Sequence, residues 1–221
     1  MRRADASDAP LIADLLEPHR LRLAAWSPQF WRPARDARSL HELYLGWLVG
    51  GDGIGFIEPG HGVIVARPQD GHLLIDDFVA DSSATALELV RAAATAGATR
   101  AVAAVADLPA NVALRANGFT ASSEWWIAPT GVTTEVGTRL DGGDPVLEIL
   151  QPPPIFDPGG PVAHLAWNRE VEPVAALAAA ASAGCALCAL EVATTDQRHA
   201  TVLTADGFSP ASRWYHRVEV G

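Results

Sequence analysis

The chain of 221 residues contains no lysine: all 16 of its cationic side chains are arginine, and 26 acidic residues outnumber them. The formal net charge is −10 and no basic run occurs. This argues against a nucleic acid partner, because proteins that bind nucleic acids meet the phosphate backbone with clustered Lys and Arg. Any anion site in this chain must therefore use arginine or backbone N–H groups.

Long apolar runs are also missing from the sequence. No stretch reaches the ~18 residues that a membrane-spanning helix needs, and the longest, at 175–190, is mostly alanine with a glycine inside. The opening segment MRRADASDAP lacks the apolar core of a signal peptide. We therefore expect a cytoplasmic protein with no membrane partner.

Cysteine is nearly absent, with Cys185 and Cys188 alone in a C-x-x-C spacing. A zinc site would need two further ligands nearby, and a thioredoxin-like pair would open a helix. The segment CALCALEV instead predicts a buried strand, on which alternation would send the two sulfurs to opposite faces. We expect buried free thiols. The seven histidines show no metal-ligand spacing, so we expect no metal.

The sequence does contain enough apolar material, 49% of its residues, for one large domain or two small ones. GGDGIGF (50–56) superficially resembles a dinucleotide loop, but it follows a predicted helix and opens a strand, so we interpret it as a turn. Helices interleaved with strands favour a layered α/β fold. In the first half we predict strands over 2–4, 54–58, 62–67, 72–80 and 101–106 and from 118, with helices from about 8, 40, 84 and 109.

Two similar segments, GFTASSEWW at 118–126 and GFSPASRWY at 207–215, indicate an internal repeat. The stretches before them also match, and Gly97 and Gly184 each end a predicted helix. Each segment is typical of the last helix-to-strand joint of a βαβαβ unit. We predict a domain over 1–130 and a shorter, truncated copy over 131–221. In this second copy we predict strands over 146–150, 162–167 and 185–192, with helices over 173–183 and 197–206.

Residues 1–128 resemble the GNAT (GCN5-related N-acyltransferase) family. The resemblance is carried by MRRADASDAPLIADLL, by the hairpin leading into IDDFVAD, by a helix ending in AGA and by LPANVALRANGF. The second half resembles a truncated copy over roughly 136–218. This implies a GNAT-like mixed central sheet flanked by helices, and an N-acyltransferase that uses acetyl-CoA or another acyl-CoA. A small-molecule or peptide amine would be the acceptor, and a homodimer is allowed.

The resemblance also implies where the acyl-CoA would bind. The family closes glycine N–H groups on the pyrophosphate, but the matching segment here, DSSATALEL, has neither Arg nor Gly. A helix N-terminus remains, whose dipole contributes on the order of 1 kcal/mol per charge. The family's Asn corresponds to Asp107 and its thiolate-protonating Tyr to Leu114. The implied cofactor-binding residues are Phe78, Val79, Ser82, Ser83, Ala84, Asp107 and Asn111.

Asp76 and Asp77 are the first candidate catalytic residues, because they stand inside the apolar strand HLLIDDFVA. Alternation predicts that they point to opposite faces, so only one would line a given cleft. There, burial would raise its pKa toward that of a general base. Alternatively, backbone N–H groups or arginine hold both. Glu124 is the next candidate, either for acid–base work or in an ion pair with Arg213.

Trp26, Phe30 and Trp31 occupy the place where the family lines its acceptor pocket, and they are either an apolar acceptor site or core packing. Our leading hypothesis is an acyl-CoA N-acyltransferase in which the amine attacks directly. The alternative is a catalytically inactive, GNAT-like ligand-binding or interaction module. The missing glycines and the missing Tyr favour that alternative.

Overall fold

The computed structural model describes residues 1–131, 147–167, 171–195 and 199–218. Its strands form one ten-stranded mixed sheet in the order β1-β2-β3-β4-β5-β10-β6-β9-β8-β7. The strands are β1 (Arg2–Arg3), β2 (Ile54–Glu58), β3 (Gly62–Gln69), β4 (His72–Ala80), β5 (Ala98–Ala104), β6 (Phe119–Pro129), β7 (Glu148–Leu150), β8 (Val162–Ala166), β9 (Leu187–Ala193) and β10 (Ser209–Arg217).

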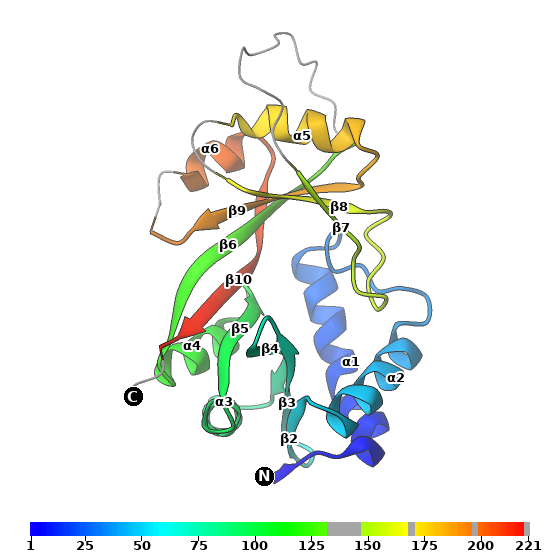
Figure 1. The fold of residues 1–221 in the computed structure, drawn as a ribbon, viewed down its shortest axis with the longest axis vertical. Helices are drawn as coiled ribbons and strands as arrows, with labels where there is room; N and C mark the ends of the chain where they lie inside the picture. The colour runs from blue at the N-terminus through cyan, green and yellow to red at the C-terminus, as the bar shows by residue number, and fades with distance from the viewer. Residues whose placement is uncertain (132–146, 168–170, 196–198, 219–221) are drawn as a thin grey trace.

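The helices flank this sheet, as Figure 1 shows. They are a short 3₁₀ helix η1 (Ala6–Asp8), α1 (Ala9–Trp26), α2 (Ala37–Gly50), α3 (Ser83–Thr95), α4 (Leu108–Ala116), α5 (Pro173–Ser182) and α6 (His199–Ala205). The predicted layered arrangement of helices on a mixed sheet is therefore confirmed. Among the described residues, no helix is both long and apolar enough to cross a bilayer.

Strand β3 is buried on both faces, and its alternating side chains pack against two separate layers of helices in the first half. Val63 and Val65 belong to the cluster formed with α1 and α2. Ile64 and Ala66 belong to the cluster formed with α3 and α4. The hairpin strands β2 and β4 have the predicted bounds, because alternating apolar residues and a Gly-containing turn fix a hairpin locally.

The two halves of the chain exchange their last strands. β10, at the C-terminal end of the chain, lies between β5 and β6, with Trp214 opposite Val102 and Ser123. β6, from the first half, pairs with β9 of the second half, so that Trp125 lies opposite Glu191. Figure 1 shows β6 and β10 running side by side through the middle of the molecule. Each half therefore completes its sheet with a strand from the other half.

The order strand–helix–strand–helix–strand occurs twice, as β4-α3-β5-α4-β6 and as β8-α5-β9-α6-β10. Gly118 and Gly207 precede the two exchanged strands, with φ of 83° and 84°. This is the left-handed region that favours glycine after a helix, and it confirms the predicted helix-to-strand joint. The predicted division of the chain at 130/131 adjoins residues 132–146, which lie outside the described residues, and it stays a prediction.

Parts of two predicted elements also fall outside the described residues: position 146 of the strand 146–150, and positions 197 and 198 of the helix 197–206. Cys185 and Cys188 are buried and free, as predicted. The expectation that they face opposite sides of a strand is wrong. Cys185 precedes β9, and both side chains belong to one apolar cluster.

Candidate functional site

The parallel strands β4 and β5 separate partway along their length. They pair from Leu73 to Ile75, which lies opposite Ala101, and no later residue of β4 pairs with β5. On the other side of β4, Val65 lies opposite Asp77 and Ala66 opposite Ile75. Asp76 is therefore the extra residue of a β-bulge, which bends the strand at this point.

The bulge overturns one prediction about the two aspartates. Simple alternation would place Asp76 and Asp77 on opposite faces of β4, but both line the same two cavities. The extra residue interrupts the alternation, and bulges commonly re-aim a side chain in this way. The two aspartates therefore line the same two cavities.

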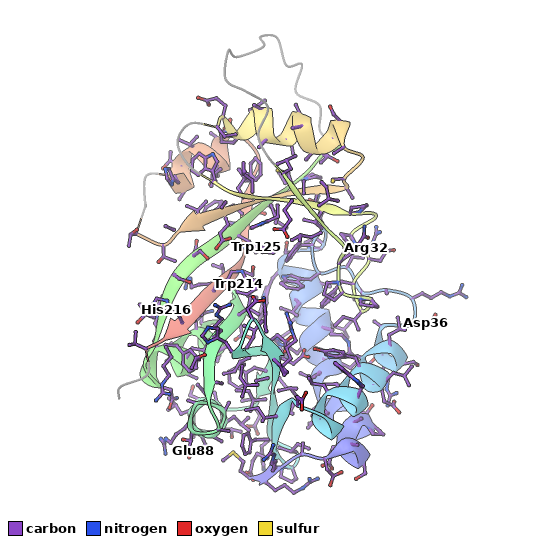
Figure 2. All side chains as sticks on the ribbon, viewed as in Figure 1. Arg32, Asp36, Glu88, Trp125, Trp214 and His216 are labelled. Carbon is purple, nitrogen blue, oxygen red and sulfur yellow. The ribbon has the colours of Figure 1, made fainter. Side chains whose placement is uncertain are left out.

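The larger of these spaces, which we name the aromatic cavity, has a volume of about 550 Å³. This lies within the range of small-molecule sites. Figure 2 places Trp125 and Trp214, from the exchanged strands, together at the centre of the molecule, where their ring centroids are 5.4 Å apart. Six aromatic side chains line the cavity: Phe30, Trp31, Tyr44, Trp125, Phe156 and Trp214.

A proline-rich segment at 150–158, between β7 and β8, forms a further wall of the aromatic cavity. It is fixed to the loop between α1 and α2, because the Ala34 N–H donates to the Ile155 carbonyl (2.9 Å) and the Asp157 N–H donates to the Arg32 carbonyl (2.8 Å). The ring of Phe156 packs on Trp31, with centroids 5.0 Å apart. The second half thus completes a cavity whose acids come from the first half.

Asp76 forms a hydrogen bond with an arginine, and its pKa is far above the ordinary value of an aspartate. Its Oδ2 accepts a hydrogen bond from Arg67 Nε at 2.5 Å, while its Oδ1 is buried without a hydrogen-bond partner. Burial, and then the negative charge of Asp77, raise the pKa of Asp76 to about 7. The group can therefore exchange a proton near neutral pH.

Asp77 is held in the ionised form by a series of buried, hydrogen-bonded side chains. The Arg20 guanidinium donates to His41 Nδ1 at 2.6 Å, so the ring proton lies on Nε2, which donates to Asp77 Oδ2 at 2.9 Å. His41 is fully buried and Arg20 nearly so. Burial by itself would raise the pKa of Asp77, but His41, His19 and Arg20 lower it below its ordinary value.

Two indole groups of the aromatic cavity also lack hydrogen-bond partners. Trp31 Nε1 and Trp214 Nε1 are buried donors with no acceptor, and Asp76 Oδ1 is a buried acceptor with no donor. Leaving such a group unmatched costs about 1–3 kcal/mol. Three unmatched polar atoms around one cavity indicate a place for a ligand that carries both donor and acceptor groups.

A smaller space, which we name the split pocket, lies where β4 and β5 part, and its volume is about 60 Å³. It shares five lining residues with the aromatic cavity: Trp31, Asp76, Asp77, Val102 and Phe156. His19 and Asp107 also line it, and burial lowers the pKa of His19. The two aspartates therefore stand at the junction of two adjoining spaces.

The predicted acceptor residues are divided by the structure. Phe30 and Trp31 line the aromatic cavity. Trp26 does not: α1 continues through it, and it lines a different cavity beside Ser27 and Pro28. Trp26 therefore lies apart from Phe30 and Trp31, and its role in binding an acceptor stays an untested prediction.

Glu124 is also apart from the aspartates, in a separate cavity of about 320 Å³. Its Oε1 accepts a hydrogen bond from Arg213 Nε at 2.8 Å, which confirms the ion pair considered from the sequence. Its catalytic role stays an untested prediction.

Among the predicted cofactor-binding residues, Ser82, Ser83 and Ala84 lie at the N-terminus of α3. Ser82 Oγ already accepts from the Thr85 N–H at 3.1 Å, while Ser83 and Ala84 are exposed. Asp81, Glu58 and Glu88 line the adjoining cavity of about 460 Å³, whose lining includes no arginine. The helix dipole there favours an anion, and the carboxylates oppose one.

The remaining predicted cofactor-binding residues lie along the split. Phe78 and Asp107 line the split pocket, and Val79 follows Phe78 on the part of β4 that pairs with β3 but no longer with β5. Asp107 also caps α4, with its Oδ1 accepting from the Ala110 N–H at 3.1 Å. Asn111 is buried, donates to the carbonyls of Ala104 and Asp107, and accepts from the Tyr215 hydroxyl. Its side chain thus fastens α4 to β10.

Sequence reasoning missed several residues of this site. Arg67 and His41 gave no signal, because each is a single polar residue within an ordinary hairpin or helix. Trp125 and Trp214 stand in the two repeated segments, but nothing in those segments indicates that the two indole groups line one cavity. Among the described residues, no group of three or more His, Cys, Asp or Glu is placed to hold a metal ion.

Comparison with known proteins supports the fold. No protein-family model matches the chain, and no curated protein matches its sequence. The chain is similar to a solved structure from Thermoplasma acidophilum, described as a candidate acetyltransferase. That match has 10% identity, covers 98% of each chain and has a TM-score of 0.51.

Two further solved structures align over most of the chain. A tandem GNAT protein from the clavulanic acid biosynthesis pathway matches at 12% identity over 96% of this chain and 95% of its own, with a TM-score of 0.47. A GNAT-family acetyltransferase from Colwellia psychrerythraea matches at 11% identity over 94% and 97%, with a TM-score of 0.44. The match to the Thermoplasma protein supports the fold, a mixed sheet flanked by helices, and nothing finer.

Proposed function

We propose that this protein transfers an acyl group from a thioester, with acetyl-CoA as the first donor to test, to an amine held in the aromatic cavity. The observation that carries the proposal is Asp76. Its carboxyl group has a pKa of about 7, and it stands at the bulge where β4 and β5 part. That is where a donor along the split and an acceptor in the cavity would meet.

Asp76 is the proposed general base. A carboxyl group that titrates near neutral pH can accept a proton from a bound ammonium and release it again, and general-base catalysis contributes ~10²–10⁴ in rate. Asp77 is the proposed electrostatic partner. Its charge is fixed by His41 and Arg20, and it raises the pKa of its neighbour.

Part of the proposed donor site fits a CoA thioester and part fits it less well. Beyond Ile75, the edge of β4 that faces β5 has no strand partner, so an extended arm with amide groups could bond to it by strand addition. The N–H groups of the exposed residues Ser83 and Ala84, in the first turn of α3, would meet the phosphates. Since no arginine lines that cavity, we expect weak donor binding.

The proposed reaction balances without an enzyme-bound intermediate. The amine nitrogen bonds to the acyl carbon as the carbon–sulfur bond breaks. One proton of the ammonium goes to Asp76, and a second ends on the departing sulfur. Leu114, at the place of the family's proton donor, is an apolar residue of the core, so water would carry that second proton.

We also infer that the chain is a tandem of two related units, the second shorter than the first. The repeated element order and the exchange of β6 and β10 support this inference. The second unit would brace the first through β10 and roof the acceptor site through the segment at 150–158.

The test combines donor binding with turnover. We expect acetyl-CoA to raise the melting temperature, because a ligand that binds only the folded state must stabilise it. We also expect mass spectrometry to detect an acetylated amine. Asp76→Asn should keep the stabilisation and lose most of the turnover. No stabilisation at millimolar acetyl-CoA, together with no product, would reject the proposal.

A second candidate function is a binding protein that holds an amine and no longer uses a donor. One observation favours it: Ser82 occupies the Thr85 N–H at the helix end where phosphates would bind. The same experiment separates the two candidates, because a binding protein would be stabilised by amines but not by acetyl-CoA, and would form no acetylated product.

A further inference from the structure

The aromatic cavity is apolar except at one end. Its charged lining residues are Arg67, Asp76 and Asp77, which meet at the bulge of β4. Rings form much of the remaining wall, and Phe30 packs edge-on against Trp125 with centroids 6.3 Å apart. Prolines of the segment at 150–158 form the wall beside them. A ligand that fills this space must therefore be mostly apolar and charged at one end.

At the charged end, one buried carboxylate oxygen has no hydrogen-bond donor. Arg67 is bonded to Asp76 Oδ2 and His41 to Asp77 Oδ2. Asp76 Oδ1 is the buried carboxylate oxygen that remains without a donor. An ammonium there would complete the hydrogen bonds of Asp76 and would also lie among aromatic rings, which attract cations through their π faces.

We infer that the aromatic cavity takes a primary amine with a single positive charge on an apolar body, such as an arylalkylamine. The role of this amine as the acyl acceptor rests on the proposed function. Its binding rests only on the lining of the cavity.

Two other classes of amine fit the lining less well. An amino acid would bring its carboxylate beside Asp76 and Asp77, where Arg67 is already bonded to Asp76. A polyamine would place its second ammonium among aromatic and proline side chains, where burying a charge without a partner is strongly unfavourable. A single terminal ammonium avoids both problems.

The unmatched indole groups add a further requirement. Trp31 Nε1 and Trp214 Nε1 are donors without acceptors, so a hydroxyl, ether or carbonyl oxygen on the apolar body would satisfy one or both. Such an oxygen should strengthen binding, since each completed hydrogen bond removes the penalty of an unmatched buried group.

The experiment is isothermal titration calorimetry on the full chain without any acyl donor. The probes are 2-phenylethylamine, phenylalanine, which differs by one carboxylate, and spermidine, which adds charges. We expect 2-phenylethylamine to bind most tightly of the three. Asp76→Asn should weaken its binding by about tenfold or more, because a charge-assisted hydrogen bond is lost. Asp70→Asn, an exposed aspartate on the same hairpin, is the matched control and should bind normally.

A second variant keeps the inference testable if Asp76→Asn does not fold. Trp214→Phe retains a ring but removes the indole N–H, and it should weaken binding of the methoxy-substituted probe 4-methoxyphenethylamine more than binding of 2-phenylethylamine. Trp47→Phe, at an indole that is 74% exposed on α2, is its control and should change neither.

The outcomes separate this inference from the proposed function. Tighter binding of phenylalanine or spermidine, or no binding of 2-phenylethylamine, overturns the inferred ligand class. If 2-phenylethylamine binds as expected but no acetylated product forms with acetyl-CoA, the ligand class stands and the acyl transfer is rejected. If spermidine is acetylated and 2-phenylethylamine is not, the transfer stands and the ligand class is rejected.

Discussion

Two parallel strand pairs occupy corresponding places in the two halves of the molecule, and they differ in how far they stay together. β8 and β9 pair at five consecutive positions, from Val162 with Leu187 to Ala166 with Glu191. β4 and β5 pair only as far as Ile75 and then part at the bulge of Asp76. The bulge therefore distinguishes the two halves. We call the first half, where β4 and β5 part and two carboxyl groups line a cavity, the open half. We call the second half, where β8 and β9 stay paired, the sealed half.

The sealed half still takes part in the site. It contributes Trp214 on β10 and the proline-rich wall at 150–158 to the aromatic cavity. The two halves therefore contribute different parts of one cavity. The open half carries the acids, and the sealed half carries much of the enclosure.

The largest effect should come from removing the strand that joins the halves. A chain that ends before Ser209 loses β10, which pairs with both β5 and β6, and it also loses the buried Tyr215. We expect it to lose cooperative thermal unfolding in circular dichroism. A chain that ends after Val218 is the control and should unfold normally. A cooperative transition in the shorter chain would contradict the shared sheet.

The next effect should come from the buried hydrogen bonds that connect Arg20, His41 and Asp77 in the open half. His41→Phe removes the partner of both Arg20 and Asp77. We expect the free energy of unfolding in urea to fall by about 1–3 kcal/mol, the penalty for a buried polar group left unmatched. His216→Phe, on the exposed side of β10 (Figure 2), should change little. Equal effects of the two changes would remove the structural role of His41.

A third effect concerns the stability lost by burying the Asp76 carboxyl group. Its pKa is about 7 in the folded state against an ordinary value of 3.8, so the folded state binds the proton more tightly. Its contribution to stability is full below pH 3.8 and falls as the pH rises to about 7. Asp76→Asn should therefore raise the melting temperature more at about pH 8 than at about pH 5. A gain that is larger at the lower pH would contradict this account.

The smallest effect should come from the sealed half. His164 Nε2 contacts Glu191 at 3.1 Å and its Nδ1 lies 3.5 Å from Glu148. The hydrogen bond to Glu191 raises the pKa of His164 against the opposing effect of burial. The stability from this cluster should be full below pH 6.5 and be lost as the pH rises through the raised value.

Thermal melts of His164→Gln across this pH window test the cluster. The variant should lose the part of the pH dependence of its melting temperature that His164 contributes above pH 6.5, whereas His216→Gln should keep it. A variant that follows the original chain at every pH would show that the cluster does not contribute.

Local sequence patterns could predict the hairpins and the repeated joints but not the exchange of strands. The bounds of β2 and β4 follow from alternation and turn residues, and the positive φ of Gly118 and Gly207 follows from their place after a helix. The segments that become β6 and β10 are similar in sequence, so no local pattern decides which neighbour each one pairs with. That choice depends on packing between residues far apart in the chain.

The candidate site could be predicted only in part for a related reason. Two acids inside an apolar strand were a usable signal for Asp76 and Asp77, but the rule of alternation misplaced one of them because a bulge is set by the partner strand. Arg67 and His41 reach the acids only through the fold. The wall at 150–158 comes from a segment with no local sign of a binding role.

The central claim is that Asp76, at the bulge, is the base of an acyl transfer. The most direct test is the pH dependence of kcat/KM with acetyl-CoA and 2-phenylethylamine, compared between the original chain and Asp76→Asn. We predict a rising limb with an apparent pKa of about 7 that disappears in the variant together with ~10²–10⁴ of the rate. A rate that is unchanged in Asp76→Asn, or the same limb in both proteins, would contradict the claim.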